Sequence, residues 1–185
     1  MIDDVLADAK DRMDKAVEAL RKELATIRTG RAHPGLIEHL RVDYYGAPTP
    51  LNQLATINVP EPRLLVIQPW DRQSLGAIEK AIQKSDLGLN PMNDGNVIRL
   101  AIPQLTEERR KELVKVVHKK VEEGRVAVRN VRRDRHDELR RLQREKEISE
   151  DTQYLGQEEL QKLTDGFIQE IERVGEEKEA ELLAV

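Results

Sequence analysis

The sequence of 185 residues contains no cysteine, which excludes disulfide bonds and thiolate chemistry and fits a reducing cytoplasm. Aromatic residues make up only 3% of the chain, too few for a protein that binds nucleic acid through a row of stacked bases. No run approaches the roughly 18 apolar residues of a membrane span. The amino terminus, Met1-Ile2-Asp3-Asp4, is acidic rather than the start of a signal peptide. We therefore expect a cytoplasmic protein with no membrane partner.

The motifs of common catalytic sites are also missing. There is no glycine-rich phosphate loop, no His-Glu-x-x-His pair and no Gly-x-Ser-x-Gly elbow. The four histidines do not lie at metal-ligand spacings from one another. We predict a protein that is not an enzyme and that uses no metal, no cofactor and no small-molecule substrate. A catalytic site assembled from scattered residues is the alternative.

Apolar residues at three- and four-residue steps predict three long helices. The first has a nearly heptad seam, and Thr29-Gly30 is expected to end it: Ile2, Leu6, Ala9, Met13, Ala16, Leu20, Leu24 and Ile27. The second runs from Thr106 to about Lys146, with this seam: Val117, Val121, Gly124, Val128, Val131, Leu139 and Leu142. The third starts at Ser149, and Gly156 and Gly175 are expected to weaken it; its seam is Leu160, Leu163, Phe167, Ile171, Val174 and Leu182.

Between the first two helices the pattern changes, because all eight prolines lie between residues 31 and 104. Short β-like runs at 40–44, 64–67 and 97–102 surround one short amphipathic helix near 72–88, with Trp70 expected in the core. The fold class is therefore α+β: a three-helix bundle (1–29 plus 106–185) with an inserted small domain (31–104). The crossings near 30–31 and 103–105 are candidate hinges, formed by Gly30, Arg31, Pro103, Gln104 and Leu105.

Charge is unevenly distributed along the chain. Residues 107–146 hold 15 Lys and Arg against 9 Asp and Glu, whereas residues 147–185 hold 3 against 12. At about 100° per residue, the basic stripe of the second helix spans roughly 80°. It consists of Arg125, Arg129, Arg132, His136 and Arg140, flanked by Arg133 and Arg144. Arg135 is excluded because it faces the apolar seam. The stripe indicates local contact with an anionic partner; the alternative is a merely solvated face.

Five sequence blocks, in order along the whole chain, resemble the family of bacterial ribosome recycling factors. They are Ile27-Arg28-Thr29-Gly30-Arg31-Ala32, the stretch 44–51 (YYGAPTPL), the stretch 85–91 (SDLGLNP), the stretch 105–111 (LTEERRK) and the stretch 126–134 (VAVRNVRRD). Five matching blocks are much more specific than any single motif. The stretch Gln153-Tyr154-Leu155-Gly156 matches no pattern of the family.

The resemblance implies an L-shaped two-domain protein, with a three-helix bundle and an inserted β/α/β domain. It implies a factor that binds the large subunit of the post-termination ribosome and its ribosomal RNA. With elongation factor G and GTP, such a factor splits the ribosome into subunits and allows release of mRNA and tRNA. The family's functional arginines correspond to Arg129, Arg132 and Arg133 and to Arg28 and Arg31, and Arg125 joins them on the stripe. The chain is expected to be monomeric. The alternatives are a coiled-coil adaptor and a general RNA-binding protein.

Overall fold

A computed structural model describes residues 1–184 of the chain. It divides into two compact units. Unit 1 comprises Met1–Ile27 and the chain from Glu107 onward, and unit 2 comprises Arg28–Thr106. Each unit has its own buried core, and each is described by itself below.

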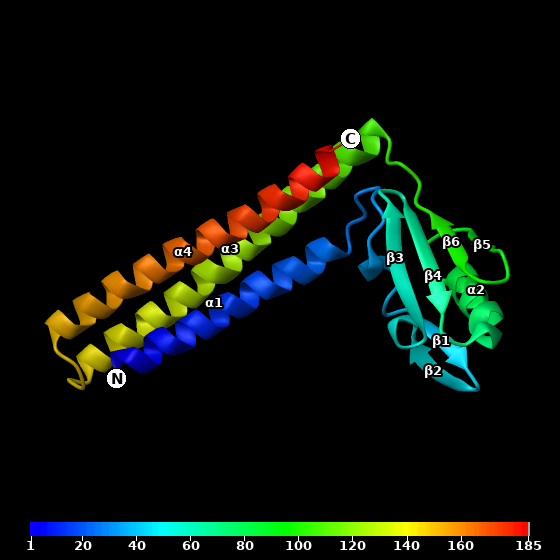
Figure 1. Cartoon of the computed structure of the whole chain (residues 1–185). Helices are drawn as coiled ribbons and strands as arrows, with labels where there is room; N and C mark the ends of the chain where they lie inside the picture. The colour runs from blue at the N-terminus through cyan, green and yellow to red at the C-terminus, as the bar shows by residue number, and fades with distance from the viewer. Residues whose placement is uncertain (185) are drawn as a thin grey trace. The chain divides into compact units, whose positions relative to one another are not determined.

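Unit 1 consists of three long helices packed side by side: α1 (Ile2–Ala25), α3 (Glu107–Arg144) and α4 (Glu150–Leu183) (Figure 1). As the sequence predicted, Ser149 caps α4, because its Oγ accepts a hydrogen bond of 3.1 Å from the backbone N–H of Thr152. The predicted end of α1 is wrong. The helix stops at Ala25, and Thr26 caps it in the right-handed conformation, where its hydroxyl donates to the carbonyl of Glu23.

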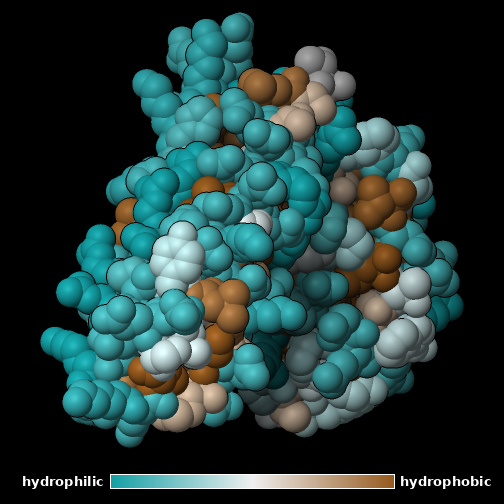
Figure 2. Space-filling view, turned by 90° about the vertical axis from the view of Figure 1, so that its left-hand side faces the viewer, coloured by the Kyte–Doolittle hydropathy of each residue, from teal (hydrophilic) through white to brown (hydrophobic). Residues whose placement is uncertain are grey.

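The core of unit 1 is the apolar seam of the three helices. The seam of α3 is buried as predicted, and α1 buries Val5 and Val17 together with the expected Ala9, Met13, Leu20 and Leu24. In α4, Leu163 and Phe167 are only half-buried, while Gly156, Thr164 and Gly175 are buried. The outside is correspondingly polar: Figure 2 shows a mainly hydrophilic surface on the face toward the viewer, with apolar groups scattered over it.

Glycines allow the helices of unit 1 to approach closely. A Cβ added to Gly175 would overlap Cγ2 of Val121, and one added to Gly124 would lie 3.0 Å from Cδ1 of Ile171. A Cβ on Gly156 would lie 3.1 Å from Leu139. The expectation that Gly156 and Gly175 only weaken α4 therefore missed their packing role. Both cost helix propensity, but they bring α4 into contact with α3.

Unit 2 contains six strands and one α-helix. They are β1 (Arg41–Tyr44), β2 (Ala47–Pro50), β3 (Ala55–Glu61), β4 (Leu64–Pro69), α2 (Leu75–Lys84), β5 (Pro91–Asn93) and β6 (Ile98–Ala101), with short 3-10 turns at Pro34–Leu36, Leu51–Gln53 and Arg72–Ser74. β1 and β2 form a hairpin, and the other strands form an antiparallel sheet in the order β3-β4-β6-β5. Leu65, Ile67, Ile78, Ile82 and Ile98 are at the centre of its core.

Three of the six strands were predicted, and the missed strands all contain proline. β2 holds Pro48 and Pro50, β3 holds Pro60, and β5 begins at Pro91. Proline cannot donate a ladder hydrogen bond, so it lowers the β signal of a sequence run. β3 and β5 are the two edges of the four-stranded sheet, where a missing donor is tolerated.

The predicted burial of Trp70 is wrong: the residue is 67% exposed. Inward-facing residues alternate along β4 at Leu65, Ile67 and Pro69, so the next position turns outward. The indole Nε1 donates a hydrogen bond of 3.0 Å to Oγ1 of Thr56 on the neighbouring strand. The prediction rested on the hydrophobicity of tryptophan. Which face of the sheet a side chain occupies is instead set by its position in the alternation along the strand.

Candidate nucleic-acid interface

The middle of α3 presents basic side chains on a rigid support. The helix has 38 residues, about 57 Å at 1.5 Å per residue, and it packs against both α1 and α4. Among the residues that the structure describes, no carboxylate lies within ion-pair distance of Arg132 or Arg133. The nearest to Arg129 is Oε1 of Glu122, at 3.9 Å. These three guanidinium groups keep donors that can bind a phosphate in bidentate fashion.

Arg125, the fourth predicted residue of the stripe, is held differently. Its Nη1 lies 2.9 Å from Glu122, and its Nε donates a hydrogen bond of 3.3 Å to Glu172 of α4. The side chain is only 28% exposed. Arg125 therefore links α3 to α4, and an outside anion would have to compete with two carboxylates for it.

On the other side of α3, charged side chains form ion pairs with α1. Arg12 of α1 lies 2.6 Å from Asp134, and Arg135 lies 3.3 Å from Asp8 of α1. The hydrogen bond from Arg12, and then that from Arg135, hold the pKa of Asp134 below its usual value. Arg135, which the sequence excluded from the stripe, is thus paired with Asp8 and Asp134. Asp134 is therefore engaged by Arg12 and Arg135.

Arg28 and Arg31 belong to unit 2. Nη1 of Arg28 donates a hydrogen bond of 2.6 Å to the carbonyl of Leu87, which joins two of the sequence blocks that carry the family resemblance. Arg31 is exposed. Unit 2 therefore holds Arg28 in a structural contact and leaves Arg31 at the surface.

The candidate hinge residues also lie within unit 2, because the crossings between the units fall at 27–28 and 106–107. Gly30 has φ +78°, a conformation that favours glycine, and a Cβ there would lie 3.3 Å from the backbone nitrogen of Leu105. The two chain segments thus touch inside unit 2. Pro103 and Gln104 precede Leu105 on the second segment, and Oε1 of Gln104 lies 3.5 Å from Nη1 of Arg63.

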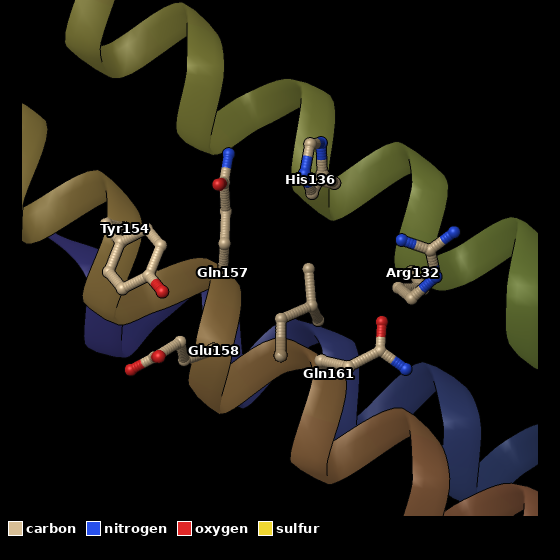
Figure 3. A pocket seen from close by; sticks show the side chains of 7 residues that line it. Arg132, His136, Tyr154, Gln157, Glu158 and Gln161 are labelled. Atoms are coloured by element: carbon tan, nitrogen blue, oxygen red, sulfur yellow. The ribbon is translucent and has the colours of Figure 1, made fainter.

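Sequence reasoning missed a groove beside Arg132. It measures about 240 Å³ and lies between α3 and α4 (Figure 3). Arg132 and His136 border it from α3, and Tyr154, Gln157 and Gln161 border it from α4. The signal was present in the sequence, because residues 154, 157 and 161 share one helix face at steps of three and four. Nothing in the spacing showed that this face borders the basic stripe.

Within residues 1–184, no group of three or more His, Cys, Asp or Glu side chains is arranged to hold a metal ion. None of the helices in this part of the chain is both long and apolar enough to cross a membrane.

The family model described as ribosome recycling factor matches residues 20–183. A protein named ribosome-recycling factor from Carboxydothermus hydrogenoformans is 60% identical over 185 residues and is covered completely, as is this chain. A protein of the same name from Roseiflexus sp. is also 60% identical over the full length of both chains.

Solved structures agree with the sequence relatives. A solution structure of the ribosome recycling factor matches with a TM-score of 0.81 and 48% identity, covering 100% of this chain and 98% of that one. A second match has a TM-score of 0.68 and 50% identity, with complete coverage of both chains. It comes from models for the T. thermophilus ribosome recycling factor and the E. coli elongation factor G bound to the E. coli post-termination complex.

Proposed function

The chain belongs to the ribosome recycling factor family, and we propose that it binds the large subunit of the post-termination ribosome and, with elongation factor G and GTP, splits the ribosome into subunits. Splitting allows the release of mRNA and tRNA. A relative of similar fold and 50% identity is described together with elongation factor G on a post-termination complex, which supports both partners. This role places the protein in the cytoplasm and requires no catalytic site of its own.

The binding step is supported by three arginines on α3 that have no close carboxylate partner. Arg129, Arg132 and Arg133 fall in a block shared with the family, and no carboxylate closer than 3.9 Å satisfies them within the described chain. Arg132 and Arg133 are unpaired and Arg129 has only the long 3.9 Å contact with Glu122, so on a helix fixed by two neighbours these groups can follow a folded RNA backbone without first breaking a close ion pair. Arg125, Arg28 and Arg31 are the outer members of this candidate surface.

The splitting step requires movement of unit 2 while unit 1 stays bound. Only two chain crossings join the units, at 27–28 and 106–107. The hinge is proposed to lie at these crossings and the adjoining residues Gly30, Arg31, Pro103, Gln104 and Leu105. In this mechanism unit 1 anchors the factor, and unit 2 transmits force from the GTPase.

The test is co-sedimentation with purified large subunits over a salt series, followed by a splitting assay with elongation factor G and GTP. If about four phosphates are neutralised, a fourfold rise in salt lowers the affinity on the order of a hundredfold. Failure of the factor to bind large subunits, or to split post-termination ribosomes with the GTPase, contradicts the proposal.

The two rival functions make different predictions. A coiled-coil adaptor needs an exposed apolar seam that can bind a partner helix. In this chain, however, the seam residues Met13, Val117 and Ile171 are completely buried. Sedimentation equilibrium should therefore show a monomer, whereas an adaptor dimerises. A general RNA-binding protein would bind unrelated RNA as tightly as large subunits, so excess unrelated RNA as competitor separates that rival from a recycling factor.

A further inference from the structure

The groove between α3 and α4 has features that the basic stripe does not explain. Tyr154 is 64% exposed at its border, and it is the exposed aromatic side chain of unit 1. Its hydroxyl has no hydrogen-bond partner among the described residues. In Figure 3, Tyr154 and Gln157 follow one another along α4, and Gln161 lies across from Arg132. Buried Leu160 lines the same groove. An open ring beside an apolar floor is a surface on which a planar group can stack.

The polar groups of the groove are suited to the edge of such a planar group. Gln157 has no hydrogen-bond partner within residues 1–184, so its amide offers both donors and acceptors. Gln161 donates to Asp165 at 2.9 Å, which leaves its carbonyl oxygen as an acceptor. Glu158 adds a second acceptor and keeps phosphate out of the groove itself. Amide and carboxylate side chains of this kind bind the edges of unpaired RNA bases.

Arg132 places this groove next to a phosphate site. It borders the groove, has no carboxylate partner within ion-pair distance in the described chain, and is preceded by Arg129 about one helical turn earlier. We propose that the groove takes the base of one unpaired nucleotide of the large-subunit RNA. The base stacks on Tyr154, its N–H donors face Glu158 and Gln161, and the neighbouring phosphates lie on Arg132 and Arg129. This inference rests on the proposed function and adds a base-binding site to it.

A base contact and a phosphate contact respond differently to salt, and this difference forms the test. Affinity for purified large subunits is measured over a salt series for the wild type and for Tyr154→Ala, Tyr154→Phe and Leu155→Ala. Tyr154→Ala should weaken binding about tenfold at every salt concentration without changing the salt slope, because stacking releases no counterions. Tyr154→Phe keeps the ring and should bind like the wild type.

Leu155→Ala is the matched control, since Leu155 is the next residue of α4, is 51% exposed and does not line the groove. It should bind normally. Base-specific chemical probing of the subunit RNA supplies an independent measurement. One unpaired base should be protected by the wild type and by Tyr154→Phe but should stay reactive with Tyr154→Ala.

Three results overturn the inference. They are wild-type affinity of Tyr154→Ala, a changed salt slope in that variant, and a loss of affinity with no base changing its reactivity. The last result would assign the groove to a protein side chain of the subunit. If the wild type binds and Tyr154→Ala binds equally well, only the groove is refuted. If the wild type does not bind large subunits, the proposed function itself fails.

Discussion

Several arginines of unit 1 differ in whether a carboxylate of another helix holds them. Arg12, Arg125 and Arg135 form ion pairs between helices, whereas Arg132 and Arg133 face no carboxylate within ion-pair distance in the described chain. Exposed ion pairs contribute at most about 1 kcal/mol, so the paired arginines mainly orient the helices. No ion pair within the described chain holds Arg132 or Arg133, which is why they are proposed to contact an outside anion.

Replacing Arg132 by alanine tests this division at the level of one residue. Binding to large subunits should weaken by about 1–3 kcal/mol, and the salt slope should fall by about one, because one phosphate contact is lost. The melting temperature and helix content should not change. Affinity is measured by co-sedimentation over a salt series, and helix content by circular dichroism.

Arg141→Ala is the control for that experiment. Arg141 lies on the same helix but is held by Glu138 and Glu145, each at 2.6 Å. The Arg141→Ala variant should therefore bind large subunits normally. A parallel loss of melting temperature in Arg132→Ala would instead give Arg132 a structural role.

Among the elements, α4 shows how glycine positions set helix packing. Gly175 is buried against Val121, and Gly166 on the same helix is exposed with no atom within 4 Å of an added Cβ. Both positions gain about 1 kcal/mol of helix propensity on substitution by alanine. Only position 175 adds a clash with a stiff, β-branched neighbour.

We therefore expect Gly166→Ala to raise the free energy of unfolding by about 0.5–1 kcal/mol. Gly175→Ala should lower it by about 1–3 kcal/mol, since overpacking of a tight contact exceeds the propensity gain. Urea unfolding of both variants measures the difference. Val121→Ala combined with Gly175→Ala should recover part of the loss, and equal stabilisation by both single substitutions would refute the close contact.

In the turn between β5 and β6, hydrogen bonds favour the ionised form of Asp94 and lower its pKa. Backbone N–H groups of Val97 and Asn96, followed by Arg99, lower the pKa of Asp94 to about 2 from an ordinary 3.8. The folded state thus prefers the ionised carboxylate. This contribution to stability is present above the ordinary pKa and is lost as the pH falls through the lowered pKa.

Between about pH 4 and pH 2, the wild type should lose stability more steeply than Asp94→Asn, and the two curves should converge at the acid end. Arg99→Ala should keep most of the dependence, because the two backbone hydrogen bonds contribute more than the arginine. Urea unfolding over a pH series gives the curves. A slope that disappears in Arg99→Ala would show that the ion pair dominates.

At the scale of the whole molecule, two compact units joined by two crossings suit a factor that holds with one unit and moves the other. Because the natural chain lacks cysteine, cysteines introduced at Thr26 and Thr29 offer unique sites for a thiol cross-link across the first crossing. Cross-linking should leave large-subunit binding intact and reduce ribosome splitting with elongation factor G, and cleavage of the linker should restore it.

A cross-link between cysteines at Lys162 and Gly166, both exposed on α4, serves as the matched control and should leave splitting unchanged. Unimpaired splitting by the protein linked across the crossing would refute the hinge. Binding that falls with the cross-link would show that the first crossing itself contacts the ribosome.

The sequence by itself determined the long helices and most of their seams, because helical periodicity is a local property that is repeated many times along each seam. It also determined the family, through five ordered blocks, and it placed the arginines on one face of α3. The carboxyl-terminal end of α1, the proline-containing strands and the exposed side of Trp70 needed the tertiary structure. Each of these depends on which partner a residue meets across a strand or turn.

The candidate site, too, could be predicted from the sequence only in part. Spacing along α3 put Arg125 and Arg132 on one stripe, but only the packing of α4 decided that Arg125 meets Glu172 while Arg132 borders an open groove. Distance between residues far apart in the chain is set by how the helices pack, and no local pattern records it. For that reason the basic face could be predicted from the sequence, whereas the free arginines and the groove beside them could not.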